Sequence, residues 1–288
     1  MTLPPSELII RPDGSIFHLC IRPEQLADRV VLAGDPERVS LIGQYFDRRE
    51  CEVVNREYHT LTGTYRGKRI TALSHGIGCG NIDIVMNELD ALANIDFATR
   101  TLRPVFRPLT LVRIGTSGGL QPDVPIGAAV VAEQSVGLDG VLYFYAGSER
   151  VRDIAFEDEL LCRLPWHVAG VRPYVVSADA ALVDQIACHD MLRGVTLTAN
   201  GFYAPQGRLL RLPLTDPALN DRLAAFRYHG RRITNCEMES SALAGLAALM
   251  GHRAMTLCCI IAARAGKQMN TAYNDHLPRL IETVLDRI

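Results

Sequence analysis

The sequence predicts an α/β protein in which helices cover a largely parallel or mixed sheet. Short apolar runs alternate with segments of helical periodicity along the 288 residues. Most of these runs are rich in Val, Ile and Leu throughout, as expected for strands that are buried on both faces. No repeat, low-complexity tract or Pro/Ser-rich linker divides the chain. We therefore expect one domain spanning residues 1–288.

Each strand is predicted where aliphatic or β-branched residues dominate a run that ends at a glycine or a polar turn. The predicted strands cover residues 29–35, 69–76, 110–119, 128–136, 172–179, 194–202 and 254–264. Pro36 suits the first position of a helix after the first strand. Apolar residues recur at helical spacing over 82–95. A second helix is expected to begin near Glu237, with Thr234 and Glu237 forming a capping box, and to end at Gly251.

Charge and composition exclude several classes of function. The chain has 30 Lys and Arg against 32 Asp and Glu, a net charge of −2 with His neutral. Such a balance gives no basic surface for nucleic acid or for an anionic membrane. No apolar run approaches the roughly 18 residues of a spanning helix, and the N-terminus lacks the apolar core of a signal peptide. The eight Cys show no CxxC pair or metal-like spacing, so we expect reduced, mostly buried thiols in a cytoplasmic protein.

Glycine occurs with arginine or threonine at the ends of predicted strands, where open α/β sheets gather ligands. After the first strand, AGDPERV places Gly34 at a turn and Arg38 in the first turn of a helix. This arrangement suits an anion, although an ordinary strand–turn–helix joint has the same pattern. In the third strand, VRIGTSGG places Arg113 close to Thr116. Their guanidinium and hydroxyl groups, with nearby backbone donors, suit an oxyanion or phosphate.

Two of the glycine motifs match known enzyme signatures only in part. In GIGCGN, Gly76 and Gly78 are present, but Asn81 stands where a dinucleotide-binding fingerprint needs glycine. Close backbone packing is the better explanation of these glycines. The GTSGG segment matches G-x-S-x-G with Ser117 as nucleophile, but that motif opens a helix, and the prolines of LQPDVPIG follow here. The sequence therefore argues against an α/β-hydrolase.

Two polar segments follow in the C-terminal half. In TNCEMESSAL, Glu237 is explained by capping, and Glu239 falls in the first helical turn, where the helix dipole tolerates a carboxylate. In GFYAPQGR, the aromatic ring of Phe202 precedes Gln206 and Arg208, which together could read a flat heterocycle. A surface loop with polar residues is the alternative interpretation of that segment.

Taken together, these segments resemble the trimeric and hexameric type of nucleoside phosphorylase. The segments that carry the resemblance are FHL (17–19), AGDPERV (33–39), REYHTLTGTYRGK (56–68), GIG (76–78), RIGTSGGLQPDVPIG (113–127), GFYAPQGR (201–208) and CEMESSAL (236–243). They occur in the family's order and spacing from about residue 16 to 265, and they are most similar to the members that cleave uridine. The resemblance implies a distorted, barrel-like mixed sheet ringed by helices. It also implies reversible phosphorolysis of uridine to uracil and ribose 1-phosphate, with no metal and no organic cofactor.

The resemblance further implies a role for each matching residue. Residues that resemble phosphate ligands are Gly34, Arg38, Arg113, Thr116 and, from a neighbouring subunit, Arg56. Residues that resemble ribose ligands are Met238, Glu239 and, again from the neighbour, His18. Residues that resemble uracil contacts are Phe202, Gln206, Arg208 and, behind them, Arg264. Donation across a boundary implies a homodimer as the catalytic unit, alone or as three dimers in a hexamer.

Several alternatives stay open. The chain could be a broader or purine-specific phosphorylase, a nucleoside hydrolase, or a nucleoside-binding relative without activity. Purine-specific members carry an Asp near the end of a late strand, where this chain has Arg264. The segment 96–110 is longer than the resemblance leads us to expect, and AGKQMN after Arg264 is not the family's typical flap. Some bacterial relatives bind a monovalent cation with residues matching Glu57, Ile77 and Asn81, but Asn81 replaces the expected Ser, so no metal is assigned.

Overall fold

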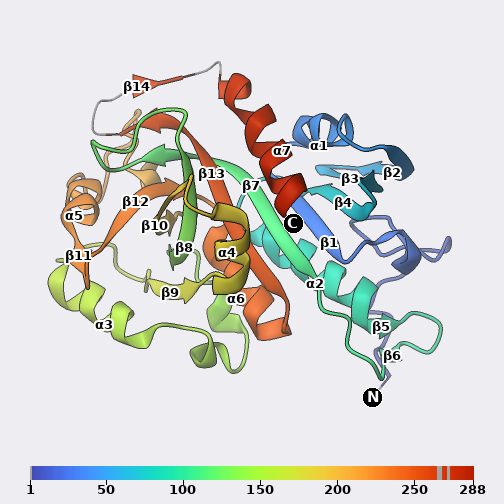
Figure 1. Cartoon of the computed structure of the whole chain (residues 1–288). Coiled ribbons are helices and arrows are strands. Elements are labelled where there is room, and N and C mark those ends of the chain that lie inside the picture. Colours follow the sequence, from blue (N-terminus) through green and yellow to red (C-terminus); the bar gives the residue numbers. More distant parts are fainter. Residues whose placement is uncertain (1, 265–267, 271–272) are drawn as a thin grey trace.

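A twelve-stranded sheet organises the computed structural model of the chain (Figure 1), which describes residues 2–264, 268–270 and 273–288. Its hydrogen-bonded order is β11-β12-β10-β8-β13-β7-β1-β4-β3-β2, with β9 on β8 and β14 on β13. The strands are β1 (Arg29–Ala33), β2 (Arg48–Asn55), β3 (Tyr58–Tyr65), β4 (Lys68–Ser74), β7 (Thr110–Gly119), β8 (Ala129–Gly137), β9 (Tyr174–Ser177), β10 (Leu192–Thr198), β11 (Arg227–Tyr228), β12 (Arg231–Glu237), β13 (Arg253–Ala263) and β14 (Gln268–Met269).

Part of this sheet closes into a barrel. Strand β7 pairs with β13 on one side and, near its end, with β12, where Asn235 lies opposite Gly119 and Cys236 opposite Gly118. Strands β12, β10, β8, β13 and β7 therefore form a closed ring of parallel and antiparallel pairs. The expected distorted, barrel-like mixed sheet is confirmed.

The remaining strands extend the sheet outward from β7. Strand β1 is parallel to both β4 and β7, and Ala33 lies opposite Ser74 on one side and Ile114 on the other. The carboxyl ends of these strands consequently meet at one edge of the sheet. Figure 1 shows this outer sheet beside the barrel, with β7 running between the two parts.

Helices pack around the sheet. They are α1 (Pro36–Gly43), α2 (Cys79–Asn94), α3 (Ile154–Arg163), α4 (Ala180–Ala187), α5 (Leu219–Ala225), α6 (Ser240–Met250) and α7 (Leu277–Arg287). Short 3₁₀ turns are η1 (Pro23–Gln25), η2 (Val141–Phe144), η3 (Ser148–Arg150), η4 (Ala204–Gln206) and η5 (Tyr273–His276). Pro36 opens α1 as predicted, and Asp35 caps that helix by accepting from the backbone N–H of Glu37 at 2.9 Å. Helix α6 is buried from Ser240 to Ala247, which fits its apolar sequence on all sides.

The predicted strands are all present, but one helix start was wrong. Thr234 lies inside β12, and its hydroxyl donates to the carbonyl of Val195 at 3.0 Å instead of capping a helix. Parallel pairing with β10 keeps the chain extended as far as Glu237, opposite Thr198. Helix α6 therefore starts at Ser240 rather than near Glu237, and Glu239 occupies its N-cap instead of its first turn.

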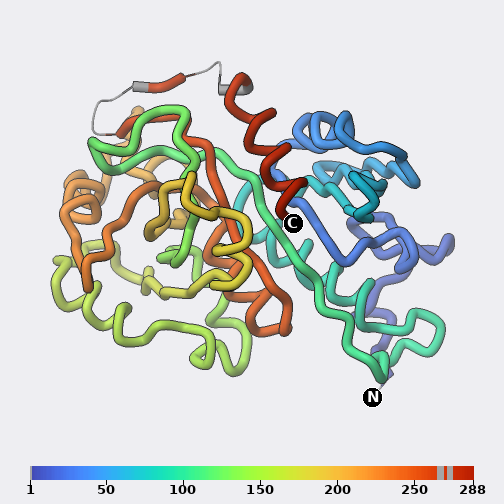
Figure 2. The backbone as a smooth tube through the Cα atoms, viewed as in Figure 1, coloured from blue at the N-terminus to red at the C-terminus, as the bar shows by residue number. Residues whose placement is uncertain are grey.

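The segment 96–110 contributes a hairpin outside the main sheet. Strands β5 (Ile95–Asp96) and β6 (Thr101–Leu102) pair with each other, and Arg100 at their turn donates to the carbonyls of Leu3 and Pro4. Figure 2 shows the N-terminal segment running alongside this hairpin. The hydrogen bonds from Arg100 thus attach the first residues of the chain to the hairpin within segment 96–110. Residues 265–267 of AGKQMN lie outside the described residues.

All eight Cys are free thiols. Four are buried, two are partly buried, and Cys162 and Cys188 are exposed, so the expectation of mostly buried thiols holds for half of them. Within the described ranges no helix is long and apolar enough to cross a membrane.

Candidate active site

A cavity of about 670 Å³ lies at the carboxyl edge of β1, β4 and β7. The strand ends form one part of its wall, and residues within 202–208 and 236–239, together with Ile261, Ala262 and Met269, form most of the rest. The predicted site residues that line it are Gly34, Arg38, Arg113, Thr116, Phe202, Gln206, Arg208, Met238 and Glu239. The topology thus brings together three groups of residues that are far apart in the sequence.

The glycine turns let the strand ends approach one another closely. A Cβ on Gly34 would lie 3.2 Å from the carbonyl oxygen of Gly76. Gly76 and Gly78 both have positive φ, and a Cβ on Gly76 would lie 2.4 Å from the Asn81 side chain. Close packing therefore explains Gly76, whereas a Cβ on Gly78 would meet nothing within 4 Å, and glycine is favoured there by its φ of 93°. In the same region Arg38 is buried, and its Nη1 donates to the carbonyl of Ile114 at 3.0 Å.

The guanidinium of Arg113 donates to four buried side chains, one of which is Cys258, whose Sγ lies 3.8 Å from Nη1. Its Nε lies 3.1 Å from Nε2 of His75, and its Nη1 lies 2.8 Å from Oε2 of Glu237. Its Nη2 donates to Oε2 of Glu239. Burial alone would lower the pKa of Arg113, but the charges of Glu239 and Glu237 outweigh burial and raise it. Arg113 is thus a fixed cation in the wall of the cavity.

Glu237 connects β12, β10 and the start of α6. Its carboxylate accepts from the hydroxyls of Thr198 and Ser240, both at 2.8 Å, and from the backbone N–H groups of Glu239 and Ser240 at 3.0 Å. With Arg113 also donating to it, this buried carboxylate is fully satisfied. Glu237 therefore sets the position of Arg113 as well as the start of α6.

Glu239 links the site to the GIG turn. Its Oε1 accepts from the backbone N–H of Gly78 at 2.6 Å, while its Oε2 accepts from Arg113. Burial raises the pKa of Glu239, Arg113 lowers it, the neighbouring charge of Glu237 raises it, and the net effect is upward. Two carboxylates and one guanidinium therefore form a tightly coupled buried cluster.

The opposite side of the cavity is built from a loop. The guanidinium carbon of Arg208 lies 3.6 Å from the ring centroid of Phe202, and Nη1 donates to Oε1 of Gln206 at 2.7 Å. Arg264 also donates to Oε1 of Gln206, at 2.8 Å, from behind this group. Burial and the charge of Arg264 lower the pKa of Arg208 to about 10. The aromatic ring, amide and guanidinium predicted to read a heterocycle do lie together.

His18, Arg56 and Arg264 do not line the cavity. His18 is held by α2, with its Nδ1 2.7 Å from Oε1 of Glu88. Arg56 is exposed at the turn between β2 and β3, with φ of 56°. Near them in sequence, the apolar side chains of Phe17 and Val54 are also exposed.

Sequence interpretation missed the importance of His75 and Glu237. Glu237 was explained by a capping box, and His75 was assigned no role. Both follow the apolar core of a strand directly, His75 after β4 and Glu237 at the end of β12. Their position at a strand end was a usable signal, but their shared contact with Arg113 depends on long-range pairing.

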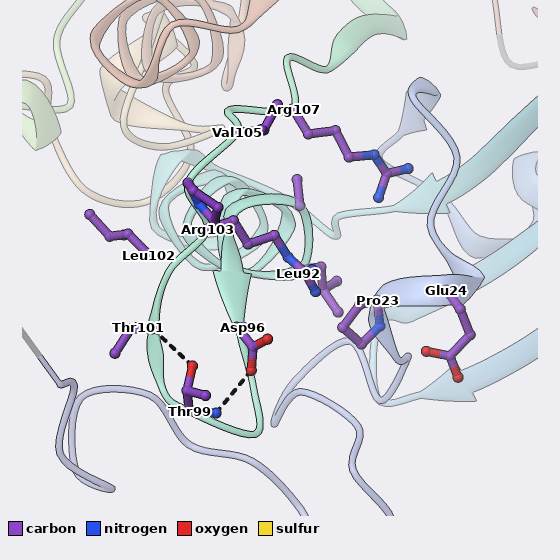
Figure 3. A pocket seen from close by; sticks show the side chains of 12 residues that line it. Pro23, Glu24, Leu92, Asp96, Thr99, Thr101, Leu102, Arg103, Val105 and Arg107 are labelled. Carbon is purple, nitrogen blue, oxygen red and sulfur yellow. Dashed lines mark hydrogen bonds between the residues drawn. The ribbon is translucent and has the colours of Figure 1, made fainter.

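A second cavity, of about 760 Å³, shares no lining residue with the first (Figure 3). It lies among Pro23, the C-terminal turn of α2 and the 96–107 segment. Its wall mixes Glu24 and Asp96 with Arg103 and Arg107, and Arg107 is already paired with Asp28 at 2.6 Å. None of the predicted site residues lies there, and its mixed charges select no class of ligand.

A metal site is not assigned either. Glu57, Ile77 and Asn81 line the first cavity. Across the part of the chain that the structure describes, no group of three or more His, Cys, Asp or Glu side chains is placed to hold a metal ion.

Known proteins are similar to this chain over most of its length. Residues 28–284 match the family described as Phosphorylase superfamily. The uridine phosphorylase of Thermococcus kodakarensis is 29% identical over 266 residues, which cover 90% of this chain and 82% of that protein. The DeoD-type purine nucleoside phosphorylase of Proteus mirabilis is 23% identical over 275 residues, which cover 93% of this chain and 97% of that protein.

A solved structure is also similar throughout. The nucleoside phosphorylase of Trypanosoma brucei, described as showing uridine phosphorylase activity, superposes with a TM-score of 0.90 and 28% identity. The alignment covers 97% of this chain and 98% of that chain. The similar proteins therefore include some that are named for uridine phosphorylase activity and one that is named a purine nucleoside phosphorylase.

Proposed function

The chain belongs to the phosphorylase superfamily, and from that premise we propose that it is a uridine phosphorylase. Membership makes it a nucleoside phosphorylase, a pentosyltransferase that exchanges the base of a nucleoside for phosphate. The relatives that are named for uridine phosphorylase support uridine as the nucleoside. Its eight free thiols fit a reducing compartment, and we propose the cytoplasm.

One observation carries this proposal: the cavity has two chemically different poles. Arg38, Arg113 and Thr116 line one pole, where two permanent cations and a hydroxyl suit a phosphate dianion. Phe202, Gln206 and Arg208 line the other pole, where a ring face and two planar polar groups suit a base. A nucleoside lying between these poles would have its C1′ facing the phosphate.

The proposed reaction is a displacement at C1′. A phosphate oxygen forms a bond to C1′ as the bond from C1′ to N1 breaks, and the bonding electron pair leaves with uracil. Arg38 and Arg113 hold the phosphate without giving it a proton, so its oxygens stay nucleophilic. Glu239 accepts from the ribose hydroxyls, and its negative charge stabilises the positive charge that develops on the sugar. Met238 borders the sugar beside it.

Recognition of uracil rests on the orientation of one amide. Oε1 of Gln206 accepts from Arg208 and Arg264, so its Nε2 is the remaining donor. Among the described residues no hydrogen-bond acceptor is found for that nitrogen, which is available to a uracil carbonyl. Arg208 meets the negative charge that the leaving base gathers. Arg264, where an Asp would protonate a purine, supports a pyrimidine.

We further propose that His18 and Arg56 complete the site of a second copy of this chain. Neither side chain lines the cavity of its own chain, and exposed apolar residues accompany them: Phe17, Val54 and, on the cavity wall, Ile77 at 73% exposure. Burial of these side chains would favour association. The catalytic unit is then a dimer, alone or within a hexamer of three dimers. Sedimentation of a fully active monomer would contradict this.

The proposed function is tested by base release from uridine, thymidine and inosine, each with and without inorganic phosphate. We expect uracil release that requires phosphate, with inosine inert. Inosine turnover that depends on phosphate would show a purine or broad specificity and a misassigned base pole. Release without phosphate would indicate a hydrolase and leave the arginine pole without its proposed ligand.

A further inference from the structure

His75 lies beneath the proposed phosphate pole, outside the cavity. It follows β4 directly, its side chain is completely buried, and it is absent from the residues that line the cavity. Its Nε2 lies 3.1 Å from Nε of Arg113. A buried histidine in contact with an arginine needs a physical explanation, because two cations would repel each other there.

The contact fixes the chemical state of the imidazole. Arginine has five N–H donors and no acceptor, so Nε2 of His75 must accept and carries no proton. The single ring proton is then on Nδ1, which has no hydrogen-bond partner among the described residues. Burial lowers the pKa of His75 strongly, and the charges of Arg113 and Arg38 lower it further. The ring therefore stays neutral and presents a lone pair to Arg113.

Neutrality matters because Arg113 already contacts two carboxylates. Glu237 and Glu239 together carry more negative charge than one guanidinium cancels. A third carboxylate on Nε would make this cluster more anionic, and the cluster would then repel phosphate. A neutral imidazole holds the Nε–H in place and adds no further negative charge to the cluster.

We propose that His75 is a positioning residue for phosphate binding, which holds Arg113 at Nε while Glu239 turns to the sugar. This inference rests on the proposed role of Arg113 as a phosphate ligand. When Glu239 accepts from a ribose hydroxyl, the Nη2–H of Arg113 that it accepted becomes available to phosphate beside the second Nη2–H, so nucleoside strengthens phosphate binding without being required for it. His75 and Glu237 then keep the guanidinium from moving with Glu239.

Three variants separate this role from a general loss of packing. His75→Gln can place an amide oxygen near the position of Nε2, whereas His75→Asn is too short and His75→Leu has no acceptor. We expect the KM for phosphate to rise about tenfold or more in H75N and H75L, and to stay within about threefold of wild type in H75Q. The KM for the nucleoside should change by less than about twofold in all three, because the base pole does not contact His75.

Thermal unfolding identifies any variant that fails to fold, and H75N and H75Q remain informative if H75L is lost. A wild-type phosphate KM in H75N would overturn the inference. So would equal rises in the KM for phosphate and the KM for nucleoside, since a merely structural role would affect both.

A double-mutant cycle with Arg113→Lys tests the contact itself. Lysine has no Nε–H at that position, so adding H75N to R113K should raise the phosphate KM by less than about twofold further. Full additivity would overturn the inference. If R113K alone leaves the phosphate KM unchanged, the assignment of Arg113 is wrong. If R113K raises it and H75N does not, only the role of His75 is wrong.

Discussion

The two poles of the cavity are built in different ways. At the phosphate pole, Arg113 belongs to a central strand and donates to four buried side chains. At the base pole, Phe202, Gln206 and Arg208 belong to a loop, and Phe202 is 45% exposed although Gln206 is buried. Exposed Leu209, Leu210 and Leu212 follow directly. The phosphate pole is thus part of the core, whereas the base pole is attached to it.

Because the two poles are built differently, we expect turnover and stability to be linked at the phosphate pole and largely independent at the base pole. A change at the phosphate pole should reduce both turnover and stability, because the same contacts serve both. A change at the base pole should reduce turnover or alter specificity with little effect on stability. Loops carried by a rigid scaffold can vary in specificity for the same reason.

The largest effect is expected for Arg113→Ala. Loss of this cation should lower kcat/KM by about 10²–10³-fold, and two uncompensated buried carboxylates should reduce the free energy of unfolding by about 3 kcal/mol or more. Steady-state kinetics and chemical denaturation measure these effects. The matched control is Arg66→Ala, which removes an exposed partner of Asp286 and should change neither quantity by much. An R113A protein of wild-type stability would contradict the expected link between turnover and stability at the phosphate pole.

Glu237→Gln should mainly destabilise the protein. The amide would place N–H groups against Arg113 or against the N–H groups that open α6, so we expect a loss of about 3 kcal/mol. Asp184→Asn, in an exposed pair with Arg193, is the control and should cost no more than about 1 kcal/mol. Equal denaturation midpoints for the two variants would argue against Glu237 as the link between β12 and α6.

Arg208→Ala should show the opposite pattern. We expect kcat/KM for uridine to fall about tenfold to a hundredfold, because a charge-assisted contact to the leaving base is lost. The free energy of unfolding should change by less than about 1 kcal/mol, since the residue lies on a loop. Arg211→Ala, an exposed arginine three residues further along the same loop, should leave both unchanged. Unaltered uridine turnover in R208A would remove Arg208 from the base pole.

The smallest effect is expected for the reactivity of two buried thiols near the poles, those of Cys236 and Cys258. Burial raises the pKa of Cys236 and of Cys258 to about 12, so both thiols should be inert at neutral pH. An aromatic disulfide reagent should react rapidly with the exposed Cys162 and Cys188, and changing both to Ser should remove the fast phase. Rapid modification of Cys236 would mean that the base pole opens to solvent far more than its loop contacts indicate.

The sequence was sufficient for features that depend on local patterns. Gly34 and Arg38 follow a strand and open a helix, so turn chemistry alone placed them together. Strand β2 was missed because its sequence, RRECEVVN, is charged and alternates in burial, and β3 was missed because the polar residues of YHTLTGTY interrupt any apolar run although the strand is buried. The capping box at Thr234 was wrong because pairing with β10 keeps β12 extended.

The contact of His75 with Arg113 needs the register of two strands that pair through β1, which no local pattern specifies. The single domain remains a prediction.

Phosphate binding to the free protein, measured by isothermal titration calorimetry, tests most directly whether the two poles are separable. We predict one phosphate per subunit in the absence of nucleoside, with binding lost in Arg113→Ala and retained in Arg208→Ala. Binding that needs nucleoside, or that both variants lose equally, would contradict an independent phosphate pole built into the core of the sheet.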